Sequence, residues 1–379
     1  MTEYDAIVIG VGGMGSAAVY HLARRGVRVL GIERYDIPNE MGSSHGVTRM
    51  IRLSIQEGRA YVPLVQRAYE LWRQLESVAG ERLLITTGSI RAGIEGDQMF
   101  EGSKEACDAH NIPYEVLTGP EVNQRFPGYQ LPEEALAVYQ PDGGFLLSER
   151  CIVTHVAAAL NLGGEVHGRE QVLGWEPKGD GVEVRTDRGA YSADKLIVCS
   201  GAWTAKLLPR LAEFAKPERQ VLAWFQPKRP QLFRPDTFPV FGVVVEEGRF
   251  YGFPSLGTTG EIPSFKVGRT HHLNQQVDPD NMDRESHLED EKVLRDFTRR
   301  YFPQAAGPTL GLKTCLFTNS PDGHFILDIL PGLPQVSVAA GFSGHGFKYC
   351  SVVGEIMADL AQHGETPHDL SMFRLARFQ

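Results

Sequence analysis

The sequence predicts an α/β protein in which a second domain of mixed-sheet α+β structure is interleaved with the first. Residues 5–33 have the pattern of strand, glycine-rich turn, helix and strand, and residues 336–364 return to a buried strand, a glycine-rich turn and a helix. Residues 216–310 are rich in Pro, Phe and polar turns, which suits a mixed sheet. No linker separates these parts, so we expect one domain of residues 1–85, 146–215 and 311–379 and another of residues 86–145 and 216–310.

The N-terminal unit is a βαβ unit. Residues 5–9 are a short buried strand, and a helix is expected over residues 15–25, with Gly26 placed to cap its end. Residues 27–32 form the next strand, which ends at Glu33. Such a strand–helix–strand unit places two parallel strands side by side.

The turn inside this unit carries a dinucleotide fingerprint. Gly10, Gly12 and Gly15 have the spacing G-x-G-x-x-G, which allows a tight turn, a close approach to a pyrophosphate and close packing of helix on strand. Glu33 follows about 20 residues on, where a carboxylate accepts hydrogen bonds from ribose hydroxyls. The single N-terminal copy and the strand–glycine–helix at the C-terminus favour FAD over NAD, so the first domain is interpreted as a Rossmann-type FAD-binding domain and the second as the substrate domain.

The remaining elements follow from their periodicity. Apolar residues at helical spacing predict a helix over residues 61–78, and residues 81–145 alternate turns with short apolar runs. Residues 182–200 predict a hairpin and a buried strand that stops at Gly201. Residues 336–340 are a further buried strand, and a closing helix has its apolar face over residues 352–360 before Gly364.

Composition excludes several classes of protein. The chain has 379 residues, 42% of them apolar, with 38 Lys and Arg against 47 Asp and Glu, a formal charge of −9. Nucleic acids and anionic membranes bind basic faces, so neither is an expected partner. No apolar run reaches the roughly 18 residues of a membrane span.

The start of the chain and the cysteines favour a reducing compartment. The N-terminus lacks the positive charge and the long apolar run of a secretory signal, so we expect a cytoplasmic protein. The five cysteines are scattered and never spaced as CxxC, which argues against a disulfide framework or a zinc site. Four of them are interpreted as ordinary buried thiols: Cys107, Cys151, Cys199 and Cys350.

Three segments point to chemistry at a flavin. Residues 42–52 (GSSHGVTRMIR) bring Arg49 and Arg52 to one face if the stretch is helical, beside a glycine-rich turn able to lie against a planar ring; the alternative is an exposed arginine pair. In residues 313–322 (KTCLFTNSPD), Cys315 taken alone is a small buried residue. In residues 341–348 (GFSGHGFK), a Gly-x-Gly turn opens a helix, and its N–H groups would stabilise negative charge on a reduced flavin; Lys348 could instead extend to solvent.

With these three segments the chain resembles the monomeric sarcosine oxidase and N-methyltryptophan oxidase family of amine oxidases over essentially its whole length. The resemblance implies FAD attached covalently to Cys315 and a substrate carboxylate held by Arg52 and Lys348. It also implies that Arg49 lies by the flavin, that Lys266 helps to activate oxygen, and that Tyr251 borders the substrate. The cofactor-binding residues predicted from the fingerprint and the resemblance are Gly10, Gly12, Gly15, Glu33, Ser43, His45, Thr48, Cys315, Gly344, Gly346 and Lys348.

The chain departs from the family pattern at four positions. A family histidine after Lys266 falls one place late, at His271, which leaves His271 without a predicted role. Phe317 replaces a tyrosine, Val47 an acidic residue and Ser44 a histidine. These departures concern the substrate more than the cofactor.

The expected activity is oxidation of secondary amino acids by a monomeric flavoprotein oxidase. The C–N bond is oxidised to an imine that hydrolyses to an aldehyde and an amine, and O2 is reduced to H2O2. One alternative is an FAD-dependent dehydrogenase that passes electrons to a carrier; another is a non-catalytic flavin-binding subunit. The sequence does not choose among sarcosine, N-methyltryptophan, pipecolate and other secondary amino acids.

Two further sets of residues were considered for the site. Phe241, Phe250 and Leu256 are either walls of the substrate pocket or core. The adjacent His271 and His272 are a poor metal site because neighbouring residues of a strand point apart, so no metal is expected.

Overall fold

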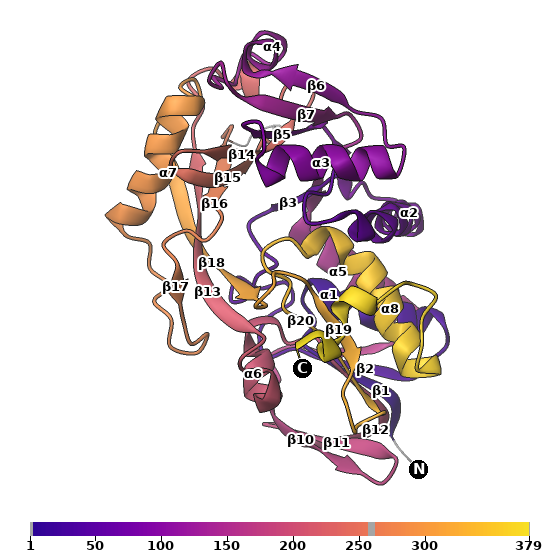
Figure 1. The fold of residues 1–379 in the computed structure, drawn as a ribbon. Coiled ribbons are helices and arrows are strands. Elements are labelled where there is room, and N and C mark those ends of the chain that lie inside the picture. Colours follow the sequence, from indigo (N-terminus) through magenta and orange to yellow (C-terminus); the bar gives the residue numbers. More distant parts are fainter. Residues whose placement is uncertain (1–2, 257–261, 379) are drawn as a thin grey trace.

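The computed structural model describes residues 3–256 and 262–378, and it confirms the α/β prediction. Two large sheets and a small one make up the fold. Figure 1 shows the N-terminal unit and the C-terminal helix at one end of the molecule and the second large sheet at the other. Among the described residues, no helix has both the length and the apolar character that crossing a membrane requires.

The first sheet has a parallel centre. Strand β1 lies between β2 and β12, each parallel to it, and β20 continues in parallel beside the carboxyl end of β12. All four residues of β2 are buried, as expected for a strand covered on both faces. The eight strands are β1 (Tyr4–Ile9), β2 (Val29–Ile32), β9 (Glu165–His167), β10 (Val172–Lys178), β11 (Gly181–Thr186), β12 (Ala190–Val198), β19 (Ile326–Ile329) and β20 (Val336–Ala340).

Helices pack against this sheet close to the fingerprint. Helix α1 (Gly13–Arg24) contacts α5 (Ser148–Asn161) and α8 (Cys350–His363), and α2 (Val62–Ala79) lies against α8. A Cβ on Gly354 of α8 would come within 2.5 Å of Ala17, so α1 and α8 need a glycine to approach this closely. Gly80 and Gly364 end α2 and α8 in the left-handed conformation, at φ 66° and 76°.

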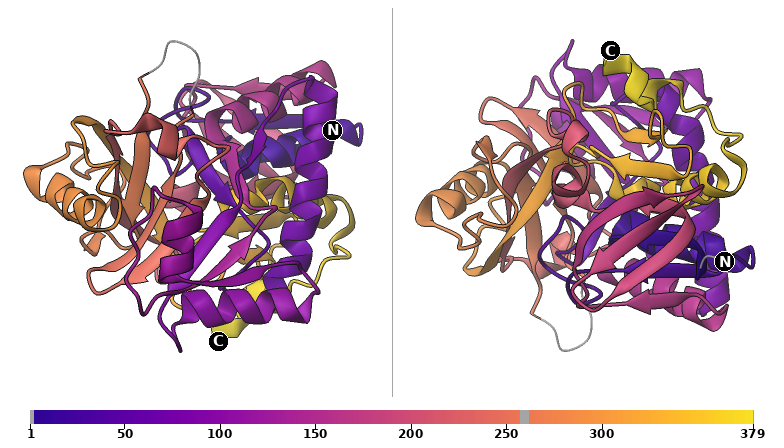
Figure 2. Two further views of the ribbon diagram at one scale, coloured as in Figure 1. Left: turned by 90° about the horizontal axis from the view of Figure 1, so that it is seen from above. Right: turned by 90° about the horizontal axis from the view of Figure 1, so that it is seen from below.

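The second sheet has nine strands and a core of aromatic rings. Helix α7 (Leu288–Tyr301) lies on its outer side, away from the N-terminal unit (Figure 2). Phe250 stacks on Phe297 of α7 at 3.8 Å between ring centres. The strands are β5 (Ser89–Gly93), β6 (Glu115–Thr118), β7 (Leu136–Gln140), β13 (Lys216–Phe225), β14 (Val240–Val245), β15 (Gly248–Phe253), β16 (Phe265–Arg269), β17 (Gln275–Gln276) and β18 (Thr309–Asn319).

The small sheet corrects one expectation. Residues 48–51, considered as part of a helix, form strand β3 (Thr48–Ile51), which pairs with β8 (Gly144–Leu147), as does β4 (Leu84–Thr86). Arg49 and Arg52 therefore do not share a helical face. Five helices had not been expected: α5 and α7, and also α3 (Gln98–Ala109), α4 (Gly119–Arg125) and α6 (Thr204–Leu207).

The predicted domain boundaries can be compared with the sheets. Strands of the first sheet all come from residues 1–85, 146–215 and 311–379, and strands of the second come from residues 86–145 and 216–310, except β18. The predicted boundary at residue 311 falls inside β18, which pairs with β13 in the second sheet over most of its length. The division into an FAD-binding and a substrate domain stays a prediction.

Candidate active site

Two neighbouring cavities define the candidate site. The first cavity, of about 360 Å³, opens at the carboxyl ends of β1, β2 and β12; the second, of about 550 Å³, lies beside it. Ligands of open α/β sheets bind at such strand ends. Four residues line both cavities and so form the boundary between them: Arg49, Phe317, Gly344 and Phe347.

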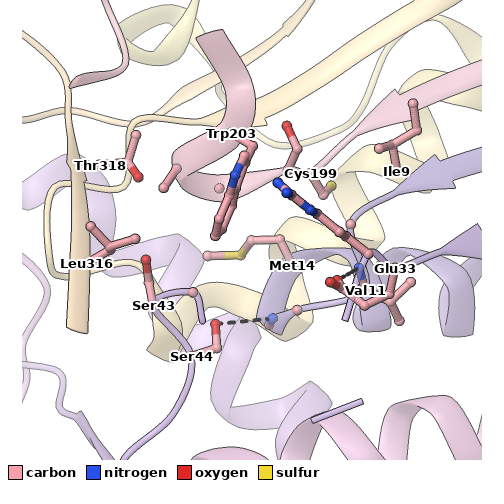
Figure 3. A pocket seen from close by; sticks show the side chains of 18 of the residues that line it. Ile9, Val11, Met14, Glu33, Ser43, Ser44, Cys199, Trp203, Leu316 and Thr318 are labelled. Carbon is pink, nitrogen blue, oxygen red and sulfur yellow. Dashed lines mark hydrogen bonds between the residues drawn. The ribbon is translucent and has the colours of Figure 1, made fainter. Parts of the chain in front are cut away.

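The glycine fingerprint forms one end of the first cavity. Gly10 has a φ of +88°, and a Cβ built on Gly15 would overlap the carbonyl oxygen of Gly10, so both positions require glycine. A Cβ on Gly12 would meet only the Ser44 hydroxyl oxygen, at 3.8 Å, so the backbone at the start of α1 is open to the cavity. The N–H of Gly13 donates to that hydroxyl at 3.3 Å (Figure 3). These groups form an anion-binding helix N-terminus.

Glu33 lies where the fingerprint places it, at the end of β2. Its carboxylate accepts the backbone N–H of Val11 at 2.9 Å (Figure 3) and that of Tyr35 at 3.0 Å, which leaves lone pairs free to accept ribose hydroxyls. Burial raises the pKa of Glu33, and the two N–H groups oppose this. The indole of Trp203 also lines the cavity (Figure 3), with the Arg34 guanidinium 5.9 Å from its ring centre.

The first cavity suits FAD. It combines an anion-binding helix N-terminus, a carboxylate for a ribose and apolar side chains such as Met14, Leu316 and Phe347, which match the pyrophosphate, sugar and ring systems of a dinucleotide. Ser43, Gly344 and Gly346, which are predicted to bind the cofactor, also line it. The other residues predicted to bind the cofactor do not line it: Gly15, His45, Thr48, Cys315 and Lys348.

His45 is buried behind the cavity wall. Neither of its ring nitrogens has a hydrogen-bond partner within the described part of the chain. Burial, with Arg49 nearby, lowers its pKa to about 3, so the ring is neutral at physiological pH. A buried imidazole without partners is a candidate for a hydrogen bond to a bound group.

The second cavity contains an arginine–glutamate pair. Arg52 is only 3% exposed; its guanidinium donates to both oxygens of Glu57, at 3.0 and 3.2 Å, and to the Ser54 carbonyl at 2.5 Å. The exposed-pair alternative is therefore wrong for Arg52. Burial acts to raise the pKa of Glu57, but the charges of Arg52 and Lys348 outweigh it and hold that pKa well below its usual range.

Lys348 lines the same cavity and does not extend to solvent. Its side chain is 4% exposed, and the ammonium donates to the His345 carbonyl at 2.5 Å. Its own carbonyl accepts the indole N–H of Trp72 at 3.0 Å, which anchors the turn before α8. Burial lowers the pKa of Lys348 to about 7, although Glu57 opposes this shift.

The boundary between the cavities brings Arg49 and Cys315 together. Arg49 donates to the carbonyls of Ser43 and Thr48, and its Nη2 lies 3.7 Å from Cys315 Sγ. Cys315 is buried on β18 and lines the second cavity, as does Tyr251 of β15. Burial raises the pKa of the Tyr251 hydroxyl, so this group stays neutral.

Lys266 is buried and lines neither cavity. Its ammonium donates to the carbonyls of Gly46 and Thr48, at 2.7 and 2.6 Å, and to the Thr48 hydroxyl at 3.0 Å. It also lies 4.4 Å from the ring centre of Phe253. Burial and the neighbouring Arg49 lower its pKa well below the usual lysine range.

The two adjacent histidines lie in the turn after β16 and not on a strand, and they contact different carboxylates. His271 contacts Glu218 at 2.9 Å, and His272 contacts Asp290 at 3.0 Å. Within residues 3–256 and 262–378 no three potential ligands are grouped to hold a metal ion. His271 does line the second cavity, half-exposed.

The structure also tests the proposed wall and thiol residues. Phe250 is a core residue that also lines the second cavity, whereas Phe241 is buried in the aromatic core and Leu256 lines neither cavity. The four cysteines interpreted as ordinary thiols are all buried and unbridged.

Sequence reasoning missed several lining residues. Trp203 follows the strand–glycine signal at Gly201, which could have pointed to it. Glu57 and Arg91 line the second cavity, but each stands in a stretch without a motif. Their importance appears only when the fold brings them beside Arg52.

Comparisons with known proteins agree with this geometry. Residues 5–360 match the family described as DAO, FAD dependent oxidoreductase. The chain is 41% identical over 381 residues to a monomeric sarcosine oxidase of Bacillus sp. (strain NS-129), covering 99% of this chain and 97% of the relative. It is 35% identical over 380 residues to an N-methyl-L-tryptophan oxidase of Yersinia pestis (strain Pestoides F), covering 100% of both.

Solved structures share the same fold. NikD, an unusual amino acid oxidase essential for nikkomycin biosynthesis, superposes with a TM-score of 0.85 at 26% identity, covering 98% of this chain and 97% of that one. L-proline dehydrogenase from P. horikoshii has a TM-score of 0.86 at 21% identity, covering 100% and 98%, which shows the fold alone. The family match and the dinucleotide cavity together establish that this chain belongs to the FAD dependent oxidoreductase family.

Proposed function

We propose that the protein is a flavoprotein oxidase of secondary amino acids such as sarcosine and other N-methyl amino acids. The observation that carries this proposal is the position of Arg52 and Lys348 in a cavity that shares a wall with the FAD cavity. Two cations beside the cofactor suit a substrate with a carboxylate near its reacting C–N bond. Relatives named for sarcosine and N-methyl-L-tryptophan support the same substrate class.

The carboxylate clamp must compete with a group of the protein itself. Arg52 already makes two hydrogen bonds to Glu57, so a substrate carboxylate either replaces Glu57 or shares the guanidinium with it. Within the described residues the Lys348 ammonium has one acceptor, the His345 carbonyl, and a lysine ammonium carries three donors. Lys348 therefore has donors left for a substrate carboxylate.

The charge of the cavity prepares the substrate amine. Only a neutral amine can lose a hydride equivalent from the carbon beside its nitrogen, because the nitrogen lone pair then forms the C=N bond of the imine. The cations around the cavity lower the pKa of a bound ammonium group and so favour the neutral amine. Tyr251 and Phe317 supply neutral walls that orient the substrate. FAD, when bound, accepts the electrons and passes them to O2, which becomes H2O2. The imine product hydrolyses to an aldehyde and an amine, so no side chain needs to act as a nucleophile.

Two residues have roles proposed toward the cofactor. Cys315, buried at the boundary of the cavities beside Arg49, would attach FAD covalently through its sulfur. Lys266 would stabilise negative charge that develops on oxygen, because its side chain is buried beside the Gly46–Thr48 segment and next to Arg49. The N–H groups of the turn at Gly344 and Gly346 would face the cofactor from the wall of the first cavity.

One experiment tests the attachment. The purified protein is precipitated with acid, and the yellow colour is followed in pellet and supernatant. We expect the colour in the pellet for the natural protein and in the supernatant for Cys315→Ala. Colour that leaves with the supernatant in both proteins rules out attachment at Cys315 but leaves FAD binding intact.

A second experiment separates the oxidase from its alternatives. Sarcosine or another N-methyl amino acid is added without oxygen, the bleaching of the flavin is recorded, and air is then admitted. Fast recovery of the colour with release of H2O2 identifies an oxidase, whereas slow recovery identifies a dehydrogenase. The absence of bleaching with every secondary amine would identify a non-catalytic flavin protein. Sedimentation of the same sample tests the proposed monomer.

A further inference from the structure

Arg91 is a buried cation in the wall of the second cavity. It lies on β5, is 4% exposed and lines the cavity together with Arg52 and Lys348. Its guanidinium donates to the side-chain oxygen of Gln56 and lies 3.8 Å from the sulfur of Met50, and its Nε has no partner within the described residues. Among the described residues, no carboxylate lies within ion-pair distance of Arg91. A buried charge without such a partner lowers the stability of the fold.

The fold provides a dedicated place for this side chain. Gly242 of β14 is the register partner of Arg91 on β5. A Cβ built on Gly242 would overlap Nη1 of Arg91 and come within 2.5 Å of its Cζ. The guanidinium thus occupies the space that any side chain at position 242 would fill. Two paired strands therefore hold the cation in a defined position at the cavity wall.

The described part of the cavity lining carries excess positive charge. Among the residues that the structure describes, the lining contains five cationic side chains, Arg49, Arg52, Arg91, Arg249 and Lys348, against two carboxylates. Both carboxylates have cationic partners already.

Glu57 pairs with Arg52 at 3.0 Å, and Asp322 pairs with Arg377 at 2.7 Å. Burial, followed by the charge of Arg52, lowers the pKa of Arg91 well below the usual arginine range. The lowered pKa means that the surrounding protein does not balance the positive charge of Arg91. A substrate with a single carboxylate, held by Arg52 and Lys348, would leave Arg91 unpaired.

We infer that the preferred substrate is a secondary amino acid with a second carboxylate on its side chain, and that Arg91 binds this second carboxylate. N-methylaspartate and N-methylglutamate are the simplest compounds of this class. The guanidinium fork is suited to a carboxylate, which accepts two parallel hydrogen bonds from it. This inference rests on the proposed function and narrows its substrate.

The test compares each diacid with its neutral amide of the same shape. For the holoenzyme we expect kcat/KM for N-methylglutamate to exceed that for N-methylglutamine by about 10- to 100-fold, the size of a charge-assisted hydrogen-bond pair. N-methylaspartate and N-methylasparagine form a second pair of shorter length. In Arg91→Met the ratio should fall to about 1, and in Arg91→Lys it should take an intermediate value, because the charge remains without the fork.

Two further variants distinguish the role of Arg91 from general effects. Gly242→Ala leaves the net charge unchanged but displaces the guanidinium, so it should reduce the ratio as Arg91→Met does. Arg299→Met removes an exposed arginine on α7 and should leave the ratio and the activity as they are. A ratio that stays high in both Arg91→Met and Gly242→Ala would overturn the inference.

A binding measurement keeps this inference separate from the proposed function. Glutarate and butyrate are titrated into the holoenzyme, and their Kd values are taken from the change in flavin absorbance. We expect glutarate to bind about 10-fold or more tightly than butyrate, and Arg91→Met to remove that advantage. Equal affinities in the natural protein contradict the inference, even if sarcosine is oxidised. Absence of turnover with all amines rejects the proposed function while the glutarate result still decides the role of Arg91.

Discussion

Binding of a simple carboxylate in the second cavity should weaken as the pH rises through 7, because Lys348 loses its charge there. Burial places the pKa of this lysine at about 7, well below its ordinary value. The protonated form attracts the anion, so affinity is highest below pH 7 and falls above it. Acetate is a suitable ligand because it stays ionised over this range and carries no amine that would titrate.

The size of the effect follows from the protonated fraction of Lys348. With a pKa of about 7, roughly nine-tenths of the lysine is charged at pH 6 and roughly one-tenth at pH 8. If only the charged form binds, the apparent Kd rises by about tenfold between these pH values. Glu57 and His345 do not titrate in this window, since the pKa of Glu57 is well below its usual range and that of His345 is about 4.

The assay measures the Kd of acetate from the flavin absorbance at pH 6, 7 and 8. Lys348→Met should give weaker binding that no longer changes with pH. His271→Gln is the control variant. His271 also lines the cavity, and its contact with Glu218 raises its pKa, so it is the other group whose titration must be separated from that of Lys348. The variant should keep the tenfold change in the Kd of acetate. The reasoning is refuted if the natural protein shows no change, or if Lys348→Met keeps the full change.

Three other substitutions test the scaffold of the site. Gly15→Ala would overlap the carbonyl of the first glycine of the turn, so we expect loss of bound FAD, measured as flavin per protein. Asp290→Ala leaves buried Arg219 without the carboxylate that it contacts at 2.9 Å through two nitrogens, and the free energy of unfolding in urea should fall by about 3–5 kcal/mol. Trp72→Phe removes the hydrogen bond to the Lys348 carbonyl and should lower that free energy by about 1–3 kcal/mol.

Matched controls keep these results specific. Gly189→Ala adds a Cβ with no neighbour within 4 Å, so flavin content should stay normal; equal losses in both glycine variants would contradict the packing argument. Asp296→Ala removes a half-exposed carboxylate that pairs with Lys292, and it should cost less than about 1 kcal/mol. A similar cost for Asp290→Ala would show that burial does not strengthen its ion pair. An unchanged stability for Trp72→Phe would mean that water replaces the lost donor.

The fingerprint was predictable because its information is local. The spacing of Gly10, Gly12, Gly15 and Glu33 encodes a turn, a helix start and a strand end within one βαβ unit. The apolar periodicity of α1, α2 and α8 likewise depends on neighbours within the helix. For this reason most of the predicted ends of these helices lie within two residues of the observed ends. Gly364, which ends α8, belongs to the same class of signal.

Elements that depend on distant partners were harder to predict. Residues 48–51 became β3 because they pair with β8, almost 100 residues further along the chain. Helix α3 is polar on much of its surface, and its start is stabilised by the Asp97 side chain, which accepts the N–H of Met99 at 2.7 Å. The sequence around α3 predicts turns that alternate with short apolar runs, because its few apolar residues do not show a clear helical spacing.

By itself the sequence determined the α/β class and the dinucleotide turn, and through resemblance it predicts Arg52 and Lys348 beside a flavin. These depend on residue type and short spacing, which a chain carries in any conformation. Only the tertiary structure decided that Arg52 is hydrogen-bonded to Glu57 and that burial lowers the pKa of Lys348 to about 7. It also decided that the guanidinium of Arg91 lies over Gly242. Such properties arise from desolvation and from contacts between strands and loops far apart in the chain, and no local pattern encodes them.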